Sequence, residues 1–101
     1  MSAAVLAPAA RRDLLAAVQW IAKDSPVAAQ TFRDDVVKMA RRIGEHPKFG
    51  SQRLELAAEQ YRFVVLTGFP YVIVYNAKRQ PPLILRILHG ARDLPEILRG
   101  M

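Results

Sequence analysis

The sequence predicts an α+β fold in which an N-terminal helical hairpin packs on a small, mainly antiparallel β-sheet. Three short apolar runs fill much of the second half of the chain: residues 61–66, 71–76 and 83–89. They are rich in the aromatic and β-branched residues that suit a pleated, half-buried surface. Only turns with Gly or Pro separate them, which indicates a meander. The first half of the chain instead repeats its apolar residues at helical spacing.

The chain begins with a short apolar stretch, residues 5–6, which is too brief for a helix and is expected to add a first strand to the sheet. Pro8 suits the first turn of a helix, because the N–H that proline lacks would be unpaired there anyway. One helical face then follows at a spacing of four and three residues: Leu14, Val18 and Ile21. We expect this helix to end near residues 23–24.

A second helix is predicted to start at Ser25 and Pro26, with Ser25 as the N-cap and Pro26 in the first helical position. Its apolar stripe consists of Phe32, Val36, Met39 and Ile43. Gly44 is well placed to be its C-terminal cap. Because only a residue or two separates the helices, they are expected to run antiparallel as a hairpin.

Two features of the first sixty residues leave alternatives open. Trp20 lies about a third of a turn away from the Leu14 face; we interpret it as core or hairpin packing, with a contact to a partner as the alternative. Residues 45–60 contain loop signals, although 54–56 would fit a strand or a helical turn. This segment is either a solvated connection or a loop that covers a functional face.

Two arginines interrupt the apolar strands. Arg62 and Arg86 must each reach solvent, a carboxylate or a ligand, because an unpaired buried guanidinium is very costly. A structural salt bridge and a ligand contact both remain open. Since 64–66 and 72–74 are apolar on both faces, we expect the hairpin to cover one face of the sheet and a groove for a partner's apolar side chains to form on the other.

The last strand leads into a polar segment, residues 89–93. Gly90 permits a sharp change of direction after His89, and Asp93 is expected to cap a short C-terminal helix. In this interpretation Arg92 pairs with an acidic group, either Asp13 or Glu96. Chemistry or recognition is therefore expected near the end of this strand.

Composition narrows the class of protein. The 101 residues are enough for one domain, residues 1–101, with a core that needs no metal or disulfide. There is no cysteine, which excludes disulfides and thiolate metal sites. Neither a membrane span nor a secretory signal is recognisable, so a cytoplasmic protein is predicted. The net charge of +6 suggests an acidic partner, either nucleic acid, a ribosome or an acidic protein, or else simply a basic surface.

The order of these elements, together with particular segments, resembles a known family. The segments are 10–14, 20–21, 61–62, 71–75 and 87–94, the last containing His-Gly-Ala-Arg-Asp. They resemble the ParE toxins of the RelE/ParE superfamily, from bacterial type II toxin–antitoxin operons. The resemblance implies a growth-inhibiting toxin whose cognate, ParD-like antitoxin wraps a C-terminal segment around it. ParE-type members are known as inhibitors of DNA gyrase, and RelE-type members cut mRNA on the ribosome.

The residues help to choose between these two activities. A metal-free ribonuclease needs an acid, a base and cations for the phosphorane charge. Arg62, Arg86 and His89 resemble such a set, but glycine follows the histidine where some nucleases have tyrosine. Arg86 and His89 also point to opposite faces of a strand unless a bulge intervenes. The sequence has no Gly-rich phosphate loop and no metal-ligand spacing, so no cofactor or metal is expected.

We therefore predict a toxin that acts by binding gyrase and is not an enzyme. The residues expected to contact the antitoxin or the target are Arg62, Arg86, Arg92 and Trp20. The alternative is a RelE-like, ribosome-dependent mRNA endonuclease that uses Arg62, Arg86 and His89 without a metal. A basic RNA-binding domain with no toxin role is the third possibility.

Overall fold

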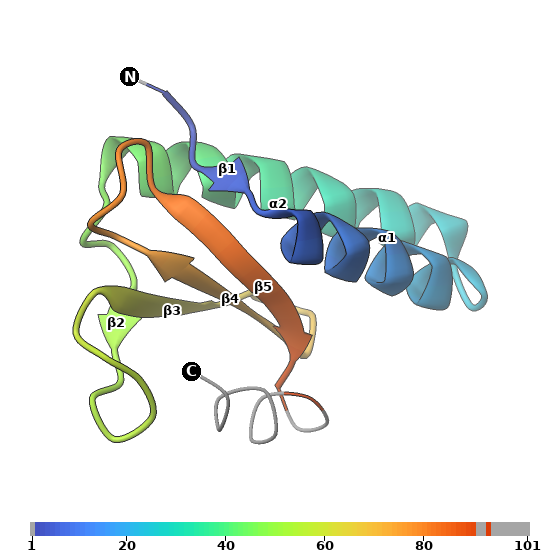
Figure 1. The fold of residues 1–101 in the computed structure, drawn as a ribbon. Coiled ribbons are helices and arrows are strands. Elements are labelled where there is room, and N and C mark those ends of the chain that lie inside the picture. The colour runs from blue at the N-terminus through green and yellow to red at the C-terminus, as the bar shows by residue number, and fades with distance from the viewer. Residues whose placement is uncertain (1, 91–92, 94–101) are drawn as a thin grey trace.

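The computed structural model describes residues 2–90 and residue 93. Two helices and five strands follow in the order β1 (Val5–Leu6), α1 (Pro8–Ala22), α2 (Pro26–Glu45), β2 (Ser51–Gln52), β3 (Tyr61–Val65), β4 (Tyr71–Asn76) and β5 (Leu83–His89). The sheet order is β1-β5-β4-β3-β2, with β1 parallel to β5 and the other pairs antiparallel. Figure 1 shows the two helices lying side by side across one face of the sheet. The predicted α+β architecture is confirmed.

Most of the predicted strands form where the apolar runs are. β1, β4 and β5 have the expected bounds, and β3 ends at Val65, one residue earlier than predicted. β2 was not predicted. It pairs Ser51 with Phe63 and Gln52 with Arg62, and both of its residues are exposed. Two polar residues after a glycine carry no strand signal, so only the neighbouring edge of β3 identifies this strand.

The helical hairpin is confirmed, including its restart. The Ser25 Oγ accepts a hydrogen bond from the Ala28 N–H at 3.1 Å, so Ser25 is the N-cap of α2 with Pro26 in the first turn. α1 begins at Pro8 without a side-chain cap. No helix in the described part of the chain is long and apolar enough to cross a membrane. The C-terminal helix expected after Asp93 lies outside the described residues.

The prediction that Gly44 caps α2 is wrong. The helix continues to Glu45, and the residue after its end is His46. A Cβ at position 44 would collide with the carbonyl oxygen of Ser2 and would lie 2.7 Å from the Cα of Ala3. Glycine in a helix interior costs about 0.5–1 kcal/mol relative to alanine. That cost is offset here because the N-terminal segment crosses the helix at backbone contact, with the Ala4 N–H donating to Ala40 O at 2.8 Å.

The sheet buries apolar residues on both faces, as the strands predicted. The hairpin side holds the larger cluster, in which the Phe32 ring lies 5.0 Å from Tyr71 and 5.1 Å from Phe69 between centroids. The second face holds Phe63, Val72, Val74 and Leu88, with Leu56 and Ala57 packed against them. The expected groove on this face is thus filled in part by the chain's own connection between β2 and β3.

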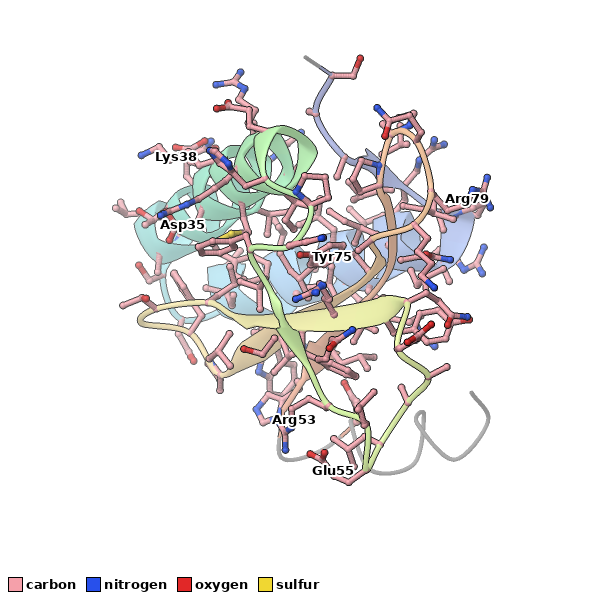
Figure 2. The ribbon with its side chains drawn as sticks, turned by 90° about the vertical axis from the view of Figure 1, so that its left-hand side faces the viewer. Asp35, Lys38, Arg53, Glu55, Tyr75 and Arg79 are labelled. Atoms are coloured by element: carbon pink, nitrogen blue, oxygen red, sulfur yellow. The ribbon has the colours of Figure 1, made fainter. Side chains whose placement is uncertain are left out.

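A buried tyrosine fixes the loop that follows α2. The side chain of Tyr75 is fully buried, and its hydroxyl donates to Pro47 O at 2.6 Å while accepting from the Gly50 N–H at 2.8 Å. Figure 2 looks onto this loop, with Tyr75 beside it. Burial raises the pKa of Tyr75 above its ordinary value, against the opposing effects of the Gly50 hydrogen bond and the Arg62 charge.

We expect Tyr75→Phe to cost about 1–3 kcal/mol at neutral pH, because it leaves the Pro47 carbonyl and the Gly50 N–H unsatisfied. The raised pKa adds a pH signature. Above about pH 10 the unfolded tyrosine ionises while the folded one stays protonated, so stability falls as the pH rises toward the folded pKa. Urea denaturation at pH 7 and at about pH 11 should show a shallower alkaline loss in Tyr75→Phe than in the parent chain.

Tyr61→Phe is the matched control, since the Tyr61 hydroxyl makes no hydrogen bond within the described residues. We expect it to change stability by less than about 0.5 kcal/mol. Equal stabilities of the two variants at both pH values would contradict the role assigned to the Tyr75 hydroxyl.

Candidate functional site

Arg86 of β5 is paired with Asp13 of α1. The Arg86 Nε donates to Asp13 Oδ2 at 2.7 Å, and its Nη2 donates to Oδ1 at 2.9 Å. The same Asp13 Oδ2 accepts the backbone N–H of Ile87 at 3.0 Å. β1 pairs only with Leu83 and Ile84, so the Ile87 N–H lies at the open edge of the sheet, beyond the end of β1. One carboxylate therefore neutralises the arginine and satisfies the edge of β5.

The ion pair is largely shielded from solvent, with side-chain exposures of 29% for Arg86 and 16% for Asp13. The hydrogen bonds to Asp13 raise the pKa of Arg86, partly opposed by burial, and the charges of Asp13 and Asp93 add to the rise. Of the two alternatives left open for Arg86, the structure therefore contains the salt bridge, with Asp13 as the partner. Asp13 was expected as one of two partners for Arg92; its partner in the described residues is Arg86.

His89 lies at the end of β5 on the hairpin side. It is paired with Tyr71, and the two rings meet edge to face with centroids 5.5 Å apart. Asp93 folds back onto it: the His89 N–H donates to Asp93 Oδ2 at 3.1 Å, and the Asp93 N–H donates to His89 O at 2.9 Å. Within the described residues, Asp93 thus closes the end of the strand.

The interpretation of Trp20 as core or hairpin packing is wrong. Its side chain is 58% exposed, and the Lys23 Nζ lies 4.9 Å from the ring centroid. The inner side of α1 is closed by Ala10 and Ala17, which are buried. Small residues bring the helix backbone close to its neighbours, so an indole off that stripe is left at the surface.

Trp20, Arg86 and His89, three of the residues predicted as site residues, lie around one corner of the molecule. A hollow of about 280 Å³ lies between α1 and the end of β5, and it is lined by Asp13, Ala16, Ala17, Trp20, Tyr71, Ile87 and Asp93. Arg86 stands behind Asp13, and His89 stands beside Tyr71. We call this the α1/β5 corner. It combines an exposed indole, two alanines in the lining of the hollow and the paired charges of Asp13 and Arg86.

Arg62 lies elsewhere. It is paired with Tyr75 across β3 and β4, and its Nη1 donates to Lys48 O at 3.1 Å and to Gly50 O at 2.7 Å. Its strand neighbour Tyr75 belongs to the hairpin-side core, whereas Arg86 is paired with Val74 of the second face. The two arginines therefore start from opposite faces and end at different places. Arg92 lies outside the described residues.

The expected opposition of Arg86 and His89 is present. The register between β4 and β5 shifts between Val74 and Tyr75, which places the irregularity at Leu85, before Arg86. From Arg86 to His89 the pairing is regular, so these side chains leave the strand on opposite faces. Among the residues that the structure describes, no group of three or more His, Asp or Glu side chains could hold a metal ion.

With this geometry established, the comparison with known families is decisive. The profile of the family described as "ParE toxin of type II toxin-antitoxin system, parDE" matches residues 4–94. The chain belongs to the ParE toxin family. The match includes both helices, all five strands and every residue of the α1/β5 corner.

A solved structure supports the fold of this ParE-family chain. It is described as "Chromosomal ParDE TA system from P. aeruginosa", and it superposes with a TM-score of 0.70 at 21% identity, covering 88% of this chain and 96% of that one. At this identity the likeness concerns the fold. No curated protein matches the sequence.

We expect Asp13→Ala to destabilise this ParE-family chain by about 2–4 kcal/mol, because it leaves both the Arg86 charge and the Ile87 N–H without their acceptor. Asp13→Asn should cost less, since an amide oxygen can still accept from Ile87 while the charge is lost. Asp24→Asn, at an exposed position in the turn between the helices, is the control. A urea series in which the Asp13 variants are no weaker than the control would contradict the bridging role.

Proposed function

We propose that this ParE-family toxin arrests growth by binding DNA gyrase, and that a cognate, ParD-like antitoxin neutralises it by covering its surface. Membership of the family supports the toxin role, and the description of that family names parDE. Gyrase is a cytoplasmic target, so the proposal places the toxin in the cytoplasm. The antitoxin is expected to bring acidic residues, because the toxin carries fifteen Lys and Arg against nine Asp and Glu.

The observation that carries a binding mechanism is the state of the candidate acid–base residues. Arg86 is held by a bidentate carboxylate, and His89 leaves the strand on the other face. Arg62 is anchored to loop carbonyls across the sheet. A ribonuclease needs its acid, base and cations within reach of one phosphate. Arg86 and His89 both lie at the α1/β5 corner but leave β5 on opposite faces, and Arg62 lies at the loop of residues 46–50. The three side chains therefore do not converge on one point, which favours recognition over catalysis.

The α1/β5 corner is the surface proposed for target contact. Exposed tryptophans beside a hollow are typical anchors of protein interfaces, where a few aromatic side chains supply most of the binding energy. Trp20 is such a residue, and the small side chains of the two alanines that line the same hollow leave room for a partner's side chain. The Asp13 and Arg86 charges at this corner are already paired with each other, so a partner would bury them without isolating either charge.

The experiment that tests the mechanism compares His89→Gln with the parent toxin on both targets. Glutamine keeps polarity and approximate size but cannot transfer protons near neutral pH. We expect inhibition of gyrase supercoiling to be unchanged and mRNA on purified ribosomes to stay intact. Ribosome-dependent cleavage that falls about a hundredfold or more in His89→Gln would overturn the proposal and establish the RelE-like nuclease.

Trp20→Ala tests the surface. We expect gyrase inhibition to weaken by about tenfold or more, as for an interface anchor, while the melting temperature changes little because the indole is mostly exposed. Leu15→Ala is the matched control: Leu15 lies on the same helix, is 59% exposed, and lines a different hollow with Arg11 and Arg33. Equal inhibition by the two variants would remove Trp20 from the proposed contact.

A further inference from the structure

A strip of exposed cations runs along the C-terminal half of α2 into the following loop. We call it the α2 strip; its basic residues are Lys38, Arg41, Arg42 and Lys48. The ion pairs among the described residues use Arg53, Lys78 and Arg86, so none involves this strip. Asp34, Asp35 and Glu45 are the acidic groups along the same stretch. Four cations against three anions leave it with a small excess of positive charge.

An aromatic side chain lies within the strip. The Arg42 guanidinium carbon stands 4.3 Å from the centroid of the Phe49 ring, which is itself 41% exposed. Stacking on a ring limits the freedom of the guanidinium without using its N–H groups as donors. An exposed ring beside cations is the combination with which proteins hold single-stranded nucleic acid, since bases stack on the ring and phosphates meet the cations.

The loop that carries Phe49 is fixed by hydrogen bonds from two side chains of the sheet, Tyr75 and Arg62. Its carbonyls at Pro47, Lys48 and Gly50 accept from the Tyr75 hydroxyl or the Arg62 guanidinium. Arg62 is bound to neutral carbonyls and has no carboxylate partner among the described residues, so its charge adds to that of the strip. A preformed loop avoids part of the ordering cost of binding.

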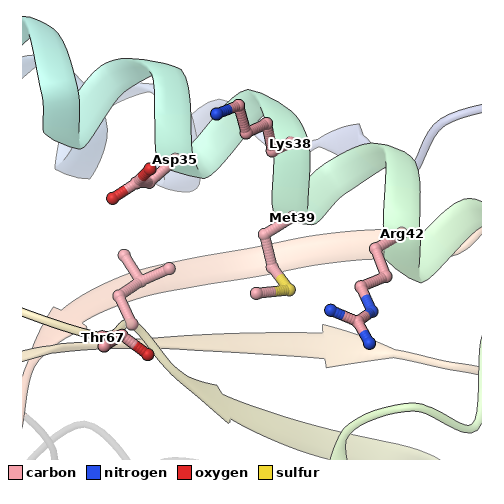
Figure 3. A pocket seen from close by; sticks show the side chains of 6 residues that line it. Asp35, Lys38, Met39, Arg42 and Thr67 are labelled. Atoms are coloured by element: carbon pink, nitrogen blue, oxygen red, sulfur yellow. The ribbon is translucent and has the colours of Figure 1, made fainter.

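A hollow of about 220 Å³ lies beside Arg42, lined by Asp35, Lys38, Met39, Arg42, Leu66 and Thr67. Figure 3 shows Arg42 reaching from α2 toward the sheet with Met39 next to it, and Thr67 on the side of Asp35, away from Arg42. Asp35 stands at the far end, on the preceding turns of the helix. Arginine is a usual partner of phosphate oxygens, so the Arg42 end of the hollow, away from Asp35, suits one phosphate.

We infer that the α2 strip binds single-stranded nucleic acid, with backbone phosphates on Arg42, Lys38 and Lys48 and a base stacked on Phe49. A single strand fits better than a duplex because its bases are free to stack on the ring, whereas a duplex offers only its backbone to such a surface. The inference does not rest on gyrase as the target, and the strip lies on α2 and its loop, whereas the α1/β5 corner lies on α1 and β5.

The test measures fluorescence anisotropy of a labelled oligo-dT of about 12 nucleotides with the purified full-length chain over a series of salt concentrations. Lys38→Gln/Arg42→Gln should weaken binding by about tenfold or more and lower the salt slope by about 1.4, roughly 0.7 for each phosphate lost. Arg11→Gln/Arg12→Gln removes two charges that are likewise exposed, from α1, and should change the affinity by less than about twofold.

Phe49→Leu isolates stacking, because leucine keeps an apolar contact for the Arg42 stem but offers no ring. With an unchanged melting temperature, it should lose about fivefold or more in affinity without a change in salt slope. No binding by the parent chain, equal losses in the α1 and α2 double variants, or a duplex of the same length bound as tightly as the single strand would each overturn the inference. Gyrase inhibition by the same variants is measured separately. It shows whether a failure concerns nucleic-acid binding by the α2 strip or the proposed gyrase target.

Discussion

One carboxylate ties the first helix of the hairpin to strand β5. Asp13, in the second turn of α1, binds the Arg86 guanidinium through both oxygens and also accepts the Ile87 N–H at the open edge of β5. An edge strand without a partner leaves backbone groups that must be satisfied in some other way. Here a helix supplies the acceptor, so the hairpin is tied to the strand that carries His89. The hollow beside Trp20 lies next to this tie, with Asp13 in its lining.

The opposite end of the sheet is organised by a second polar contact, around the hydroxyl of Tyr75. A buried hydroxyl is costly unless it is paired, and this one both donates and accepts toward the loop of residues 46–50. Arg62 adds two further hydrogen bonds to the same loop. The loop therefore has a defined shape without regular secondary structure of its own, which is why Phe49 and Lys48 have fixed places beside α2. The hydrogen bonds of Asp13 support the α1/β5 corner, and those of the Tyr75 hydroxyl support the loop end of the α2 strip.

The sequence was sufficient for the elements whose signals are local. Ser25 and Pro26 define the start of α2, and β-branched runs define β4 and β5 almost to the residue. It was insufficient wherever a distant segment decides. Gly44 looked like a helix end because the crossing of residues 2–3 that requires it is not visible in the sequence. Trp20 looked like core because its hydrophobicity is visible and the close alanine packing of α1 is not. Arg86 was recognised as needing a partner, but the helical carboxylate that provides it came only from the fold.

The two strand arginines show what separates a structural cation from an available one. Both are anchored, and burial or hydrogen bonding alone would not distinguish them. Arg86 is anchored by a carboxylate, so its charge is cancelled where it lies and it attracts little else. Arg62 is anchored by carbonyl oxygens, which hold the guanidinium in place without cancelling its charge. One topology can serve different activities, so the fold alone cannot decide what a ParE-family chain does. The group that each arginine is paired with is more informative about activity than the fold. A cation that assists a reaction must keep its charge until the substrate binds.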